Sequence, residues 1–256
     1  MKKLLASLGL VSVLMAGTAH ASVTINPQRV IFNGPDRSAE LTLANPTNER
    51  QVYRLEWVQL TMEQDGALRM AAPGEAKQPA ADMVRFSPRQ VTIEPGKSQK
   101  IRLSLRKPDG LADGEYRSHL RVVTDKGVDS LPPVNAPVSP SGEEGMSVRI
   151  VMNYGTSVPV TVLNGAAKGG AALASAKAGK EGVTVKINRD GNAGVVGDLV
   201  LLSGGKELAQ QRGVGVYANL NSRDAVIPYK GKAPAGTKVE YRDAITGKVL
   251  AATTLN

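Results

Sequence analysis

Hydrophobic and polar residues alternate with a period of two along most of the chain, as in strands that bury one face. In the first half, this pattern predicts strands over 38–44, 51–60, 90–93, 100–105, 116–123 and 147–154. Before them, residues 22–25 and 29–32 frame a strand that Pro27 interrupts, so we expect an edge strand or a change of sheet there. Short strands with turns between them favour a β-sandwich.

The second half continues the alternation with smaller side chains. Its predicted strands cover 160–163, 183–188, 199–202, 214–217, 225–229, 238–242 and 249–255. Residues 165–182 form a Gly/Ala/Lys tract of low complexity, and no helical period runs longer than about two turns. The sequence therefore predicts an all-β chain with one domain over 22–155 and a second β-sandwich domain over 156–256.

Two segments depart from the strand pattern. Residues 1–21 combine Lys2 and Lys3 with an apolar run and end in Ala19-His20-Ala21, which is typical of a secretory signal peptide. The apolar run is short for a membrane span, so we expect cleavage, export to the periplasm and no membrane insertion afterwards. Residues 124–145 contain four prolines and are expected to form a long loop, because the strand after them still has to close the first sandwich.

Composition excludes several kinds of site. The chain has no cysteine and only two histidines, His20 and His119, which excludes disulfides, thiol catalysis and cysteine-ligated zinc. No G-x-S-x-G, H-E-x-x-H or phosphate-binding glycine loop is present, although a Ser/His/Asp arrangement assembled by the fold stays open. We therefore expect no enzyme, no cofactor and no metal site, and a structural role for His119.

Positive charge is concentrated in the second half. Residues 156–256 carry 13 basic and 7 acidic residues, whereas residues 22–155 carry 17 and 16. A nucleic-acid surface would interleave basic and aromatic residues, but this half has only Tyr217, Tyr229 and Tyr241. Export also argues against nucleic acid as a partner, so we interpret the excess as a solvated lysine-rich surface.

The most informative segment is 146–154, with the sequence MSVRIVMNY. Alternate side chains of a strand share one face, and one face here carries the large apolar residues Met146, Val148, Ile150 and Met152. This row either faces the core or belongs to an exposed edge strand that pairs with another chain. Proteins normally protect such an edge, so an edge that keeps its apolar row favours strand addition to a partner.

Several segments together resemble the periplasmic chaperones of the chaperone–usher pilus pathway, the PapD-like superfamily, in its archaic or alternate branch. These segments are INPQRVIF over 25–32, FSPR over 86–89 with the IEPG and QKIRL that follow, GEYRSHL over 114–120, and YGTSVPV over 154–160. GEYRSHL is the most specific of them. The resemblance covers most of residues 22–160 and is weak beyond.

The resemblance implies two immunoglobulin-like β-sandwich domains arranged in an L shape with a cleft between them. It also implies that Met146, Val148, Ile150 and Met152 form a donor strand that fills the groove of an incomplete pilus subunit. The partners would be pilus or fimbrial subunits and an outer-membrane usher.

Members of this family hold the terminal carboxylate of the subunit with basic residues in the cleft. Arg29 matches the first of these residues, and Arg149 or Arg117 is the candidate for the second. Two other classes of exported protein also remain possible from the sequence. A surface subunit would carry an N-terminal donor extension and a single incomplete domain, and a lectin-like binding protein would need a polar or aromatic pocket.

Overall fold

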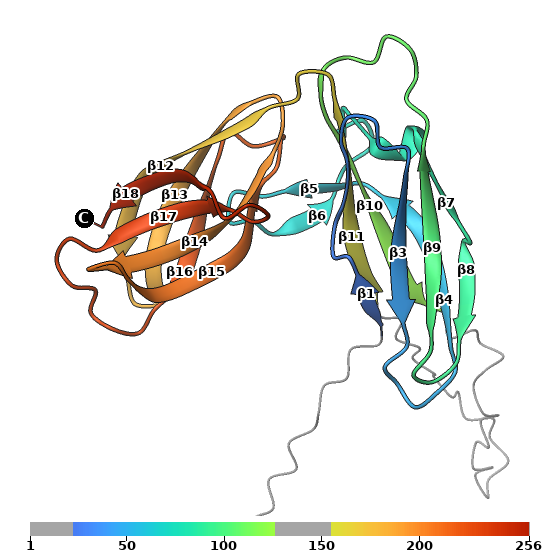
Figure 1. Cartoon of the computed structure of the whole chain (residues 1–256), viewed down its shortest axis with the longest axis horizontal. Coiled ribbons are helices and arrows are strands. Elements are labelled where there is room, and N and C mark those ends of the chain that lie inside the picture. Colours follow the sequence, from blue (N-terminus) through green and yellow to red (C-terminus); the bar gives the residue numbers. More distant parts are fainter. Residues whose placement is uncertain (1–22, 126–154, 256) are drawn as a thin grey trace, which may run out of the picture.

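The computed structural model describes residues 23–125 and 155–255, and its regular elements there are strands apart from one short 3₁₀ helix, η1 (Ala80–Asp82). Figure 1 shows two β-sandwiches set at an angle, which gives the molecule an L shape. The predicted all-β fold with two immunoglobulin-like sandwiches is thus confirmed. The predicted signal peptide, most of the 124–145 loop, the row Met146, Val148, Ile150 and Met152, and Arg149 all lie outside the described residues.

The first sandwich consists of two sheets and a separate hairpin. One sheet has the order β1–β3–β9–β7, with β1 (Thr24–Asn26), β3 (Ser38–Ala44), β9 (Ser98–Leu105) and β7 (Val84–Ser87). The facing sheet has the order β2–β11–β10–β4–β8, with β2 (Val30–Phe32), β11 (Gly155–Asn164), β10 (Gly114–Thr124), β4 (Gln51–Val58) and β8 (Gln90–Ile93). The hairpin pairs β5 (Leu60–Met62) with β6 (Leu68–Met70).

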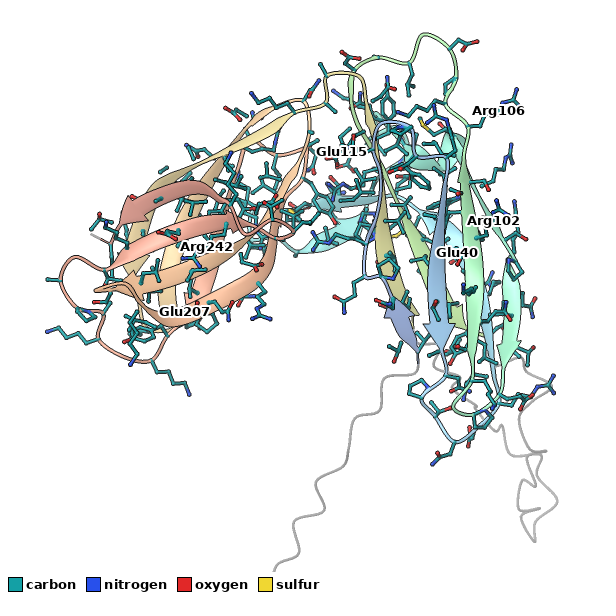
Figure 2. The ribbon with its side chains drawn as sticks, in the orientation of Figure 1. Glu40, Arg102, Arg106, Glu115, Glu207 and Arg242 are labelled. Atoms are coloured by element: carbon teal, nitrogen blue, oxygen red, sulfur yellow. The ribbon has the colours of Figure 1, made fainter. Side chains whose placement is uncertain are left out.

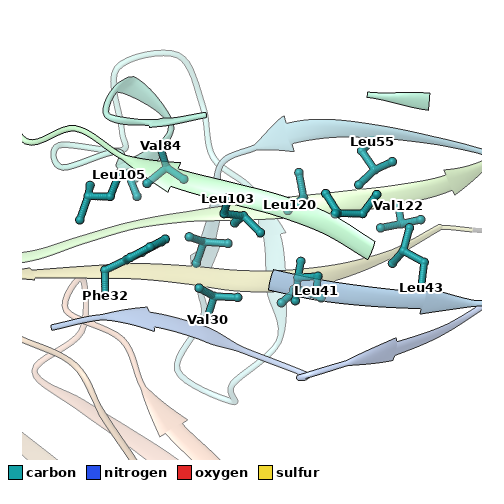
Figure 3. Packing of buried hydrophobic residues seen from close by; sticks show 14 of the residues in the cluster. Val30, Phe32, Leu41, Leu43, Leu55, Val84, Leu103, Leu105, Leu120 and Val122 are labelled. Carbon is teal, nitrogen blue, oxygen red and sulfur yellow. The ribbon is translucent and has the colours of Figure 1, made fainter. Parts of the chain in front are cut away.

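The first core follows directly from the alternation of side chains. In β9, Ile101 and Leu103 are fully buried while their neighbours Arg102 and Ser104 are exposed. They meet the buried Leu41 and Leu43 of β3 on the same sheet. Figure 3 shows Leu41, Leu43 and Leu103 packed against residues of the facing sheet, including Leu55, Leu120 and Val122.

The chain changes sheets at Pro27, as the sequence predicted. β1 pairs with β3, whereas β2 runs parallel to β11 in the other sheet. The predicted boundary at 155/156 separates strands that the structure keeps together, because β11 pairs with β10 and β2 and buries Val158 and Val160 in the first core. The chain leaves the first sandwich only after Asn164.

The second sandwich also consists of two sheets. One has the order β12–β13–β16, with β12 (Gly169–Ala178), β13 (Gly182–Gly191) and β16 (Ser222–Pro228). The other has the order β15–β14–β17–β18, with β15 (Lys206–Val216), β14 (Val195–Ser203), β17 (Lys238–Asp243) and β18 (Val249–Thr254). In its core the Tyr241 hydroxyl donates to Val214 O at 2.7 Å, and a Cβ on Gly197 would clash with the Tyr241 ring.

Two strands, β12 and β7, and the β5–β6 hairpin were not predicted from the sequence. β12 forms within the Gly/Ala/Lys tract, where backbone pairing with β13 needs no large side chains. β7 lies at the edge of its sheet and has only four residues. The β5–β6 hairpin comes directly after β4, near the end of the strand predicted over 51–60. The chain turns back at Asp65 and Gly66, so β6 pairs with β5.

Candidate functional site

A cleft of about 620 Å³ lies between the two sandwiches. The first sandwich contributes residues of β2, β10 and β11 and of the β5–β6 hairpin, and the second contributes β14, β15, β16 and the β17–β18 turn. Both described candidates for the anchoring role, Arg29 and Arg117, line this cleft. The structure therefore brings together two arginines that lie 88 positions apart in the sequence.

The two faces of β11 lie in different surroundings, one in the first core and the other at the cleft. Val158, Val160 and Val162 point into the first core and are buried. The residues between them, Pro159 and Thr161, line the cleft. Because side chains alternate along a strand, this one strand forms part of the core on one side and part of the cleft wall on the other.

One edge of β11 is only partly occupied. On one side it pairs with β10 from Gly155 to Asn164. On the other side, β2 pairs only with residues 160–162, so among the described strands none occupies that edge of residues 155–159. An unpaired edge presents a row of backbone N–H and C=O groups that another strand can use.

Arg29 stands immediately before β2 and is half-buried in the cleft wall. No ion pair or hydrogen bond joins its side chain to another residue in the described part of the chain. Its guanidinium faces the second sandwich, since a Cβ placed on Gly213 of β15 would lie 3.8 Å from Arg29 Nη2. A cation in this setting is available to an anionic group that enters the cleft.

Arg117 differs from Arg29 because its charge is already paired. Its Nε donates to Glu115 Oε1 at 2.6 Å, and the Glu115 side chain is only 3% exposed. Its guanidinium lies 3.7 Å from the centre of the Tyr217 ring. Burial alone would lower the pKa of Arg117, but the charge and hydrogen bond of Glu115, together with the smaller contribution of Tyr217, outweigh burial and raise it. Arg117 is therefore held as a cation within the contact between the sandwiches.

Glu115 connects the two sandwiches directly, and Figure 2 labels it where they meet. Gly194 N of the second sandwich donates to Glu115 Oε2 at 2.7 Å, and Glu115 N donates to Asn192 O at 3.2 Å. A Cβ on Gly194 would lie 3.0 Å from Val216 O and 3.1 Å from both Glu115 Oε2 and Arg117 Nη2. Glycine is thus the residue that allows this close approach.

His119 lies beside this contact and is 1% exposed. Its Nε2 is 3.1 Å from the Tyr217 hydroxyl, and the two rings stack at 5.8 Å. Its buried Nδ1 has no hydrogen-bond partner among the described residues. Burial, and secondarily the charge of Arg117, lowers the pKa of His119 to about 4. His119 is thus a neutral packing residue between the sandwiches at neutral pH.

The β5–β6 hairpin forms a second bridge to the second sandwich (Figure 1). Asn219 Nδ2 donates to Met62 O at 3.0 Å, and Asp224 N donates to Gln64 O at 3.1 Å. The Arg223 guanidinium lies against Gly66, where it would clash with any Cβ. This bridge was not predicted from the sequence, although an Asp-Gly pair between two alternating apolar segments is a strong hairpin signal.

The described residues contain no group of three or more His, Cys, Asp or Glu side chains placed to hold a metal ion. Within the same residues, no helix is long and apolar enough to cross a membrane. The cleft lining contains arginines and exposed apolar side chains.

Comparisons with known proteins give a fold but no family. No family model matches the sequence, and no curated protein matches it. Among solved structures, a chain of the CsuC–CsuE chaperone–tip adhesion subunit pre-assembly complex, from archaic chaperone–usher Csu pili of Acinetobacter baumannii, matches with a TM-score of 0.50 and 13% identity. The match covers 92% of this chain and 98% of that chain.

Two further solved structures are similar over most of the chain. The E. coli chaperone DraB matches with a TM-score of 0.49 and 16% identity, covering 92% of this chain and 96% of its own. The Pseudomonas aeruginosa CupB2 chaperone matches with a TM-score of 0.48 and 13% identity, covering 90% and 97%. At these identities a likeness concerns the fold alone. The match to the Csu complex chain confirms the fold that the resemblance to pilus chaperones implied.

Proposed function

We propose that this chain is a periplasmic chaperone that captures subunits of a chaperone–usher pilus by strand addition and delivers them to an outer-membrane usher. The observation that carries the proposal is the open edge of β11 over residues 155–159. In the sequence this edge follows directly on the apolar row Met146, Val148, Ile150 and Met152. The proposed role needs neither a catalytic group nor a cofactor.

The alternation of side chains along β11 supports the donor role of that row. Val158, Val160 and Val162 are even-numbered and face the first core, and the four row residues are even-numbered too. In the proposed donor strand, which would continue β11 toward residue 146, alternation would place the row on the same side as these valines. The described pairing of β10 with β11 begins at the Val123–Gly155 pair, so in the sequence the proposed row precedes the part of β11 that β10 covers.

The chemistry of the partner follows from these groups. A partner that adds its strand to this edge satisfies the backbone N–H and C=O groups of residues 155–158 that point away from β10, whereas Pro159 has no N–H to donate. Each large apolar side chain that the row buries in the partner contributes about 1.5–3 kcal/mol. Arg29 is then the candidate to hold a carboxylate of the subunit, with Arg149 as the second candidate and Arg117 less free because of Glu115.

Replacing Ile150 with aspartate is expected to lower the amount of subunit that co-purifies with the tagged chain from the periplasm by at least about tenfold, because the buried apolar contact is lost. The matched control is Val151→Asp, which changes the neighbouring residue on the opposite face of the strand. Thermal unfolding of both free variants should match that of the wild-type chain.

Two outcomes would contradict the proposal. If Ile150→Asp unfolds the free chain, the row is part of the core and the donor role is wrong. If the wild-type chain is a stable monomer that recovers no subunit, an exported ligand-binding sandwich or surface subunit becomes the better interpretation, and a glycan-binding screen follows.

Replacing Arg29 with alanine is expected to weaken capture of the subunit about tenfold, because a charge-assisted hydrogen bond in the cleft is lost. Arg102→Ala is the control, since Arg102 is an exposed arginine on the outer face of the other sheet (Figure 2). Arg29→Lys should retain part of the affinity because it keeps the charge. Unchanged affinity in Arg29→Ala, measured on purified complexes, would remove Arg29 from the anchoring role.

A further inference from the structure

Exposed apolar side chains of the described residues gather at the cleft. The described part of the chain exposes seven large apolar residues, and five of them line the cleft: Ile31, Leu68, Val226, Ile245 and Leu250. Single exposed apolar residues are normal on a protein surface, but a group of them around one hollow is typical of an interaction site. Three of the five belong to the second sandwich, which the donor-strand proposal leaves without a role.

Ile245 is the most exposed of them, at 76%, and stands in the turn between β17 and β18. The Asp243 carboxylate fixes this turn, because its Oδ1 accepts from Ile245 N at 3.1 Å and from Thr246 N at 2.7 Å. Ala244 N also donates to Val196 O of β14 at 3.3 Å. The turn is thus held in shape while its isoleucine stays in solvent, so little conformational freedom is lost when Ile245 contacts a partner.

The position of the turn connects it to the proposed capture site. Ile245 lines the same cleft as Pro159 and Thr161 of β11. Figure 1 shows the β17–β18 turn directed toward the β5–β6 hairpin of the first sandwich. A subunit that adds its strand to the edge of β11 therefore lies next to a cleft whose opposite wall carries Ile245.

The charged residues of the cleft also favour a subunit as its occupant, because they leave a positive charge free to pair with an acidic group. Four arginines and two acids line it, and both acids are engaged, Glu115 with Arg117 and Asp243 within its own turn. Arg29 has no partner in the described part of the chain. The cleft is complementary to a surface that combines an acidic group with apolar side chains.

We propose that the turn from Asp243 to Lys248 is a second contact for the captured subunit, with Ile245 packing on an apolar side chain of that subunit. The inference rests on the proposed function, since the occupant is the subunit held at β11. It assigns the second sandwich a direct part in binding. Ile245 thereby adds to the affinity for the subunit.

The test uses the subunit that co-purifies with the tagged wild-type chain, as a purified complex. Ile245→Asp and the uncharged Ile245→Ser are both expected to raise the dissociation constant about tenfold while the complex still forms. The control is Val249→Asp in the same hairpin, because Val249 is 45% exposed and does not line the cleft. A photoreactive amino acid at position 245 should cross-link this same subunit, and one at position 249 should not.

Each outcome decides the inference. Equal affinities for the wild-type chain and both Ile245 variants overturn it and leave the donor-strand role intact. Weaker binding in Ile245→Asp alone overturns it too, because the negative charge added to the cleft then explains the loss. If the wild-type chain recovers no subunit, the proposed function fails, and the inference fails with it.

Discussion

Replacing Glu115 with alanine is expected to lower the free energy of unfolding by about 3–5 kcal/mol, because it removes one partner of a buried ion pair. The change leaves the Arg117 guanidinium, whose side chain is 14% exposed, without its carboxylate. It also leaves Gly194 N without its acceptor. The chain can relieve this cost by separating the sandwiches and exposing Arg117 to water. We therefore expect a lower Tm together with a larger radius of gyration by small-angle X-ray scattering.

A matched ion pair on the same sheet is the control for this prediction. Glu56 of β4 pairs with Arg121 of β10, but both side chains are considerably more exposed, at 29% and 43%. Exposed pairs contribute little, so Glu56→Ala should cost less than about 1 kcal/mol and leave the radius of gyration unchanged. Glu115→Gln keeps an acceptor for Gly194 N and should fall between the two. Equal effects of Glu115→Ala and Glu56→Ala would show that Glu115 does not join the sandwiches.

The stability of the chain is expected to fall by about 3 kcal/mol as the pH drops from about 6.5 to about 4, through His119 alone. Burial lowers the pKa of His119 in the folded chain to about 4, from an ordinary value of 6.5. Above pH 6.5 the histidine is neutral in both states and contributes nothing. Between the two values the unfolded chain binds a proton that the folded chain does not bind, so acid favours unfolding.

The variant His119→Gln isolates this contribution. Glutamine stays neutral and can still contact the Tyr217 hydroxyl, so the other titrating groups cancel when the two chains are compared. Chemical denaturation at several pH values should show the difference between variant and wild type shifting in favour of the variant below pH 6.5 and levelling off near pH 4. Two curves that stay parallel over this range would contradict the lowered pKa.

The alternation of side chains predicted much of the fold. Leu41, Leu43, Ile101 and Leu103 form core rows because a strand buries every second residue, and this period is visible in the sequence. Pro27 likewise marked the change of sheet between β1 and β2, because proline cannot donate to a ladder. The alternation does not say which strands pair, so β11 was expected in the second sandwich although it completes the first.

The candidate site was only partly visible in the sequence. Arg29 and Arg117 were both named, and both line the cleft. The surroundings of Arg117 could not be predicted. Tyr217, which contacts Arg117, and Gly194, which donates to Glu115, belong to the other sandwich, and only the packing of the domains brings them close. Ile245 was missed for the same reason, because one isoleucine in a polar turn has no pattern until the turn is placed beside the cleft.

The shared strand β11 has a consequence for register. Val158, Val160 and Val162 are locked in the first core, so β11 cannot slide along its own axis without moving all three out of it. A slip by one residue would exchange the core and cleft faces of the strand. A strand that adds to residues 155–159 is therefore aligned against a reference that the hydrophobic core itself holds fixed. The packing that stabilises the first sandwich thus also fixes the register of any strand that pairs with β11.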